Sequence, residues 1–151
     1  MASEIEKLIK TLKNKINDDN CFEFSNNIDG CVIKASNYKL KVRFDGCADR
    51  YFSKDGGCDC IFIFSDEVCI VECTTGKFGS RDAKRKSEQI KACYNLVRSL
   101  SYRGLIVAIF YYESFSKNIS KERVELELKD IKKKDRGFII KFRKCGKEPI
   151  A

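Results

Sequence analysis

The sequence predicts an α/β domain with a central mixed sheet flanked by helices. Three observations lead to this prediction. Residues 3–17 place apolar side chains at helical spacing, two short apolar runs at 60–64 and 68–73 are typical of a strand hairpin, and a helical pattern over 80–102 precedes a continuous apolar run at 105–112. A chain of 151 residues fits one domain over its whole length.

The first part of the chain predicts one helix and then strands. Ser3, followed by Glu6, resembles a capping box, which places the start of the first helix at its N-terminal end. Residues 31–35 and 40–44 then change to the alternation of apolar and polar side chains that is typical of strands. These strands lead into the hairpin.

The second half of the hairpin is followed by a predicted crossover. Ser80 is a good N-cap, Asp82 lies in the first turn, and Gly104 is expected to end the helix. The apolar run at 105–112 fits a strand that is covered on both faces. Strand, helix and buried strand in this order predict a right-handed crossover, with the strands at 68–74 and 105–112 parallel in one sheet.

Residues 120–136 fit two patterns. Their apolar positions alternate as in a strand, and they also show helical spacing, so both structures stay open for this segment. Gly137 then introduces residues 138–142, which are predicted to form a strand.

The charge of the chain favours a polyanionic partner. The 30 Lys and Arg residues against 22 Asp and Glu residues leave a net charge of +8. Residues 81–103 hold seven bases and two acids, and residues 132–147 hold eight bases and one acid. Concentrated positive charge binds nucleic acid through release of counterions, so we expect a nucleic acid, DNA first, as the partner. Solvated Lys-rich surfaces are the alternative explanation.

The sequence predicts a cytoplasmic protein without a membrane partner. The longest apolar stretch, 105–112, is too short to cross a bilayer, and the N-terminus lacks the apolar core of a signal peptide.

The residue types restrict the chemistry. With no histidine, catalytic triads, His-based zinc hydrolysis and His general bases are excluded, so any acid–base or metal chemistry must use carboxylates, Lys, Tyr or Cys. The nine cysteines do not form paired zinc knuckles, and we expect most of them to be small buried hydrophobes. Cys60 and Cys73 are expected to face each other across the hairpin. A disulfide-tolerant intracellular setting is the alternative, and an odd count leaves at least one unpaired thiol.

Two carboxylates mark the ends of the hairpin. If the turn has an even number of residues, for example two at Asp66–Glu67, then Ile61 opposes Glu72, and Asp59 and Glu72 become diagonal neighbours on one face, about 7–8 Å apart at the backbone. Two carboxylates at this spacing can lean toward one cation. A turn of odd length would send them to opposite faces.

These residues resemble a known superfamily. Gly56-Gly57-Cys58-Asp59, then Glu72-Cys73-Thr74 thirteen residues further on, then Gln89 in the next helix, look like the PD-(D/E)XK nucleases. The resemblance spans roughly residues 40 to 112. It implies a restriction-endonuclease-like αβββαβ core and a divalent-metal-dependent nuclease that hydrolyses phosphodiester bonds in DNA.

The resemblance also implies roles for individual residues. Asp59 and Glu72 would be the metal ligands, together with the backbone carbonyl of Cys73, and hard oxygen ligands of this kind suit Mg²⁺ or Mn²⁺. The cation would polarise a phosphodiester and lower the pKa of an attacking water. Gln89 would orient that water or a nearby phosphate.

The sequence departs from the superfamily at Thr74, which stands where the motif has Lys. A hydroxyl cannot supply the positive charge that stabilises the developing phosphorane oxygens. Lys77 is the nearest replacement, and Lys84 and Lys86 on the helix are others whose stems are long enough to reach the site. A working enzyme with a migrated lysine and a catalytically inactive nucleic-acid-binding protein of the same fold both stay open.

A third alternative is a basic structural or adaptor protein. Many members of the superfamily act as dimers, so a homodimer is a further possibility.

Overall fold

A computed structural model describes residues 3–52, 57–115 and 119–151. Gly56, the first residue of the motif that carries the superfamily resemblance, lies outside the described residues. The helices are α1 (Glu4–Lys15), α2 (Ser80–Ser99), α3 (Ile119–Glu127) and α4 (Lys129–Lys134), with short 3₁₀ helices at Asp19–Cys21 and Ala48–Phe52. The strands are β1 (Asn27–Ile28), β2 (Cys31–Val32), β3 (Leu40–Arg43), β4 (Cys60–Ile63), β5 (Glu67–Phe78), β6 (Leu105–Phe115) and β7 (Phe138–Lys144).

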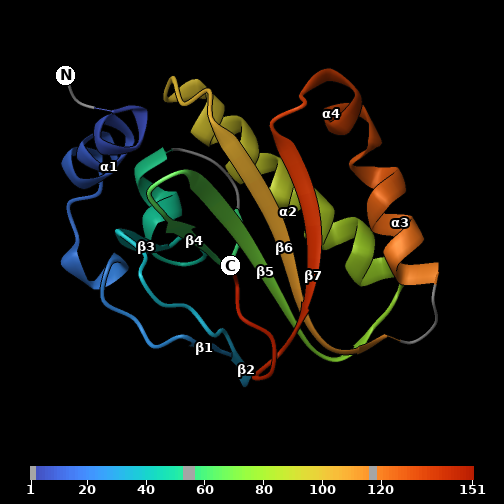
Figure 1. The fold of residues 1–151 in the computed structure, drawn as a ribbon. Helices are drawn as coiled ribbons and strands as arrows, with labels where there is room; N and C mark the ends of the chain where they lie inside the picture. Colours follow the sequence, from blue (N-terminus) through green and yellow to red (C-terminus); the bar gives the residue numbers. More distant parts are fainter. Residues whose placement is uncertain (1–2, 53–56, 116–118) are drawn as a thin grey trace.

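The centre of the molecule is a five-stranded mixed sheet in the order β3-β4-β5-β6-β7 (Figure 1). Strands β3, β4 and β5 form an antiparallel meander. Strand β6 runs parallel to β5, and β7 runs parallel to β6. The predicted α/β class and the predicted parallel pairing of residues 68–74 with 105–112 are therefore confirmed.

The start of each long helix follows from its first residues. The side chain of Ser3 accepts a hydrogen bond from the backbone N–H of Glu6 at 3.1 Å, as the capping pattern predicts. Helix α2 differs from its prediction, because its N-cap is Gly79 and not Ser80. The carboxylate of Asp82 accepts from the N–H of Gly79 at 3.2 Å and so satisfies this helix end.

Helix α2 ends earlier than predicted. It stops at Ser99, and Ser101 takes the left-handed conformation with φ of +67°. Gly104, the predicted terminator, has a different role. A Cβ atom added at Gly104 would lie 2.4 Å from the hydroxyl oxygen of buried Tyr102, so only glycine fits there without moving Tyr102.

Residues 120–134 form most of the helices α3 and α4, which decides between the two open patterns. Val124 and Leu128, four positions apart, are fully buried under α3, whereas Leu126 is 57% exposed. Alternation would have placed all three on one face, so the helical period explains the burial.

All four helices pack on one face of the sheet. Apolar side chains of α1, α2 and α3 join one cluster with every second residue of the strands, and Ile131 of α4 packs against it. The chain passes from β5 to its neighbour β6 through a helix, and from β6 to the next strand β7 through two helices (Figure 1). Both crossovers move in the same direction across the sheet. Crossovers of the same handedness then place their helices on the same face.

The other face of the sheet is covered without helices. Its second apolar cluster combines the alternate strand residues with Cys31, Ile33 and Ile150. Figure 1 shows the C-terminal segment running beside β2, where a disulfide joins Cys31 to Cys145. The N-terminal hairpin and the C-terminal segment therefore form the second layer together.

Six of the nine cysteines form disulfides, so the expectation that most of them are simple buried hydrophobes is wrong. The pairs are Cys21–Cys47, Cys31–Cys145 and Cys58–Cys93. Cys60, Cys69 and Cys73 are free and buried. Disulfides are unusual in an ordinary cytosol, and the cytoplasmic location stays a prediction. Among the described residues, no helix has both the length and the apolar character needed to span a membrane.

Candidate active site at the end of the central hairpin

The hairpin has the predicted parity with a different register. Cys60 pairs with Val71 and Ile61 with Ile70, so the predicted pair Ile61–Glu72 is wrong by two residues. The turn is Ser65–Asp66, closed by a hydrogen bond from Phe64 N–H to the carbonyl of Glu67 at 2.9 Å.

A shift of two residues leaves every side chain on its face. The ladder ends at the Cys60–Val71 pair, and Asp59 and Glu72 are the next residue on each strand. Cys60 and Cys73 both belong to the apolar cluster on the opposite face of the sheet. They do not face each other as predicted, because the shifted register pairs Cys60 with Val71.

Asp59 is held from three sides. Its backbone N–H donates to the carbonyl of Val71 at 3.2 Å, and its own carbonyl accepts from Phe44 at 3.1 Å. Its carboxylate accepts from the backbone N–H of Cys73 at 2.7 Å. The acid therefore continues the strand pairing of β4 while its side chain reaches across to β5.

Glu72 lies in the middle of β5 on the face that α2 covers. Its side chain is 0% exposed. Lys86 Nζ lies 3.1 Å from Glu72 Oε2. With its amide nitrogen turned toward Glu72, Gln89 donates to Oε1 at 2.9 Å and to Oε2 at 3.2 Å. The helix thus supplies donors to both carboxylate oxygens.

Lys86 is the centre of this cluster. Its ammonium donates to the backbone carbonyl of Cys73 at 2.9 Å and lies 3.8 Å from Asp59 Oδ2, in addition to its contact with Glu72. One cationic atom is therefore surrounded by oxygens of Asp59, Glu72 and Cys73. These are the three groups that the superfamily resemblance assigns to a metal ion.

The electrostatics of the cluster favour a proton on Glu72. Burial and the neighbouring Asp59 carboxylate raise the pKa of Glu72 well above its usual range, and Lys86 opposes this shift only in part. A cation bound by the Glu72 carboxylate would have to displace that proton.

Lys77, the predicted replacement for the missing lysine, is not part of the cluster. It is exposed on β5 beyond an irregularity between Thr74 and Lys77, and within the described residues it forms no ion pair with Asp59 or Glu72. The lysine that the structure brings to the carboxylates is Lys86. Asp59, Glu72, Gln89 and the carbonyl of Cys73 do converge, as the sequence predicts.

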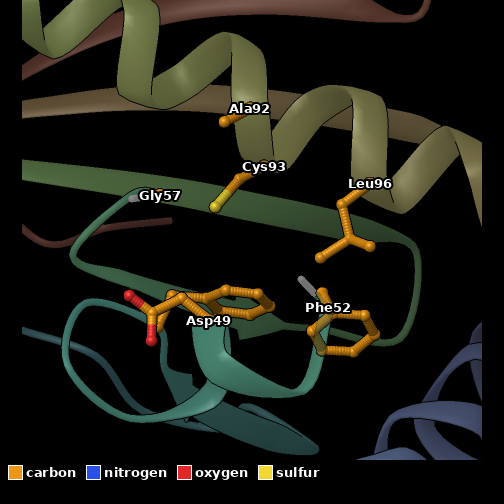
Figure 2. Close-up of a pocket in the computed structure, with 7 residues that line it drawn as sticks. Asp49, Phe52, Gly57, Ala92, Cys93 and Leu96 are labelled. Atoms are coloured by element: carbon orange, nitrogen blue, oxygen red, sulfur yellow. The ribbon is translucent and has the colours of Figure 1, made fainter. Parts of the chain in front are cut away.

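A disulfide fixes the loop that carries Asp59 to the helix that carries Lys86. Cys58, the residue before Asp59, is bonded to Cys93, one turn beyond Gln89. Beside this bond lies a small apolar pocket of about 30 Å³, where Cys93 and Leu96 point from α2 toward Phe52 and Gly57 (Figure 2). Covalent and apolar contacts therefore hold the two halves of the site together.

A polar pocket of about 190 Å³ lies next to the cluster. The end of β5, the turn after β1 and the first turns of α2 form its walls. Its lining residues are Ile28, Asp29, Cys73, Thr74, Thr75, Asp82, Arg85 and Lys86. The hydroxyl oxygen of Thr74 is buried and has no hydrogen-bond partner in the described part of the chain.

A second group of potential metal ligands does not fit a metal. Atoms of Asp18, Cys21 and Cys47 lie within 4.8 Å of one another. Cys21 and Cys47 are joined in a disulfide, so neither offers a thiolate. The cluster around Glu72 is therefore the better candidate, because its ligands are hard oxygens.

The chain matches no known protein family, no curated protein and no solved structure in comparisons with each of these sets.

Proposed function

We propose that this protein is a divalent-metal-dependent nuclease that hydrolyses phosphodiester bonds in DNA. The observation that carries the proposal is the convergence of the Asp59 and Glu72 carboxylates and the Cys73 carbonyl on one cationic nitrogen. Three hard oxygen donors, two of them charged, suit Mg²⁺ or Mn²⁺. The net charge of +8 supports a polyanionic substrate.

The strand order adds support for the superfamily resemblance. An antiparallel meander followed by a helix and a parallel strand is the αβββαβ arrangement that the resemblance implies. We extend the proposal to a restriction-endonuclease-like core over α1 to β6, with β7 as an addition.

Each residue has a proposed role in the hydrolysis, which adds a hydroxyl group to phosphorus and a proton to the leaving oxygen. Asp59, Glu72 and the Cys73 carbonyl would hold the cation, which supplies a Lewis acid and a water of lowered pKa when it is bound. Gln89 orients Glu72 through both of its oxygens. Lys86 carries the positive charge that the motif places at position 74, and stabilises negative charge on the phosphoryl oxygens.

A nucleic-acid-binding protein without catalysis is the second candidate. The observation in its favour is that Lys86 and Gln89 already satisfy Glu72, so the cluster has a structural function even without a cation. A basic adaptor protein is the third candidate, and it requires neither cleavage nor DNA binding.

Cleavage of labelled single-stranded, duplex and branched DNA in Mg²⁺ or Mn²⁺ tests the proposal. We expect Asp59→Asn and Glu72→Gln to abolish cleavage, and Glu88→Gln, on an exposed position of α2, to leave it unchanged. Cleavage that survives both site substitutions would remove this site. Salt-sensitive DNA binding without cleavage would favour the second candidate, and absence of both would favour the third.

A further inference from the structure

We propose that the polar pocket beside Thr74 is a subsite for one phosphate group of the nucleic acid, and that Lys86 moves its ammonium into this pocket when a divalent cation takes the three oxygens. The inference rests on the proposed function and adds to it a substrate subsite and an order of binding, in which the cation precedes the phosphate.

The first step concerns where Lys86 lies now. Its ammonium is 2.9 Å from the Cys73 carbonyl, 3.1 Å from Glu72 and 3.8 Å from Asp59. A cation bound by the same three oxygens would occupy the same space and carry the same sign of charge. The two cannot share the position, because like charges at this separation repel strongly in a buried site.

The second step concerns where Lys86 can go. Lys86 already lines the polar pocket, and its flexible four-carbon stem allows the ammonium to turn without moving the helix. Thr74 lies on the same face of β5 as Glu72, two residues further on. Its hydroxyl oxygen is buried and has no partner in the described residues, so it is an acceptor that the relocated ammonium would satisfy.

The third step concerns what the pocket would bind. The pocket has two bases, Arg85 and Lys86, and two acids, Asp29 and Asp82. One carboxylate oxygen of Asp82 already pairs with Arg85 at 3.1 Å, and the other accepts from Gly79 at 3.2 Å. A divalent cation at the neighbouring oxygens would therefore change the balance of charge in favour of an anion.

A pocket of about 190 Å³ with hydroxyl, ammonium and guanidinium donors suits a phosphate group. The subsite is thus expected to bind phosphate only when the cation is present. This makes Thr74 a positioning residue, since it would orient the Lys86 ammonium that contacts the phosphate.

Metal binding separates this inference from the proposed function. We expect Lys86→Met to bind Mn²⁺ at least about tenfold more tightly than the wild type. In the wild type the Lys86 ammonium occupies the metal position most of the time, and the apparent affinity for Mn²⁺ falls in proportion to the fraction of molecules in which that position is free. Lys84→Met, which removes an exposed charge two residues earlier on α2, is the control and is expected to change the affinity little. Equal or weaker binding by Lys86→Met would overturn the inference while leaving a metal site in place.

A crystal of the wild-type protein soaked in Ca²⁺ tests the same movement without any substitution. The expected result is a cation among the oxygens of Asp59, Glu72 and Cys73, with Lys86 Nζ beside Thr74. A bound cation with Lys86 still on the Cys73 carbonyl would overturn the inference. Absence of any bound cation, in the crystal and in the Mn²⁺ titration, would instead overturn the proposed function and this inference with it.

Phosphate binding tests the subsite. Titration of inorganic phosphate into the Ca²⁺-loaded protein is expected to show binding that is absent without Ca²⁺. Thr74→Val keeps the shape and removes the hydroxyl, so it should weaken phosphate binding by about fivefold, the value of one hydrogen bond, with Mn²⁺ affinity unchanged. Phosphate binding that ignores Ca²⁺, or is unaffected by Thr74→Val, would overturn the subsite.

Discussion

The disulfide between Cys58 and Cys93 is predicted to position the residues of the candidate site, in addition to stabilising the fold. It joins the residue before Asp59 to the helix that carries Lys86 and Gln89. Replacing both cysteines by alanine leaves Asp59 attached to β4 but removes the covalent link between the carboxylate strand and the helix.

The loss of stability follows from the loop that the bond closes. The two cysteines are 35 residues apart, and the loop-closure entropy for this length corresponds to about 3.8 kcal/mol at 25 °C. The Cys21–Cys47 bond closes a loop of similar length, 26 residues, worth about 3.5 kcal/mol on the same relation. In the described part of the chain, none of the hydrogen bonds or ion pairs of the carboxylate cluster involves Cys21 or Cys47, so the pair Cys21→Ala, Cys47→Ala is a matched control.

Urea unfolding and Mn²⁺ titration of the two double variants provide the assay. Both should lose stability by nearly the same amount. Only the Cys58–Cys93 variant should lose Mn²⁺ affinity, by about 10–100-fold, the range seen when groups that orient metal ligands are removed. Equal changes in Mn²⁺ affinity in the two variants, or none in either, would refute the positioning role of this bond. Failure of the wild type to bind Mn²⁺ would count against the proposed function itself.

Three further predictions concern charge. Burial raises the pKa of Glu72 above the ordinary value of 4.5, so as pH rises the folded state keeps this proton to a higher pH than the unfolded state does. The free energy of unfolding should therefore fall by about 1.4 kcal/mol per pH unit from about pH 4.5 up to the raised folded pKa. Urea unfolding of Glu72→Gln should lack this slope. Hydrogen bonds from Tyr94 and Arg98 outweigh the effect of burial and lower the pKa of Asp135, so the stabilisation from its carboxylate is lost as pH falls through that lowered pKa. Asp135→Asn should lower the free energy of unfolding in urea by about 1–3 kcal/mol. An unchanged unfolding midpoint would contradict this. Arg81→Gln, at the start of α2, should reduce the salt dependence of DNA binding by about one phosphate contact. Lys13→Gln, at an exposed position of α1 outside both basic segments, should not.

The hairpin shows which part of the site follows from sequence. Its faces could be predicted, because strand periodicity of two assigns Asp59 and Glu72 to one side for any even turn. Its register could not, because Ser65–Asp66 and Asp66–Glu67 are both acceptable two-residue turns. They lie one residue apart along the chain, and moving the turn by one residue shifts every cross-strand partner by two. The ladder therefore ends at the Cys60–Val71 pair, with the two acids as the next residue on each strand.

The lysine shows what the sequence left open. Lys77 was nearest along the chain, but the irregularity after Thr74 and its exposure keep it out of the cluster. Lys84 and Lys86 were the other candidates, and of these Lys86 lies three residues before Gln89 and therefore on the same helix face. Whether that face meets β5 depends on helix packing.

The disulfides show a different limit. Nine cysteines allow many pairings, and spacing along the chain does not select among them. The pair Cys31–Cys145 spans 114 residues and depends on how the N-terminal hairpin meets the end of β7. Only the packing of the face without helices brings these residues together.

The unequal lengths of β4 and β5 explain why a cation-binding carbonyl exists at this point of the sheet. Strand β4 begins only at Cys60, opposite Val71, whereas β5 continues to Phe78. Beyond Val71, the edge of β5 that faced β4 therefore loses its partner strand. The N–H and carbonyl of Cys73 lie on this edge, and the side chains of Asp59 and Lys86 take the place of a strand. A buried carbonyl must have a partner, and a cation on Cys73 would be that partner in place of the ammonium. Lys86 would then be free to donate to another acceptor, and the unpaired hydroxyl of Thr74 is such an acceptor.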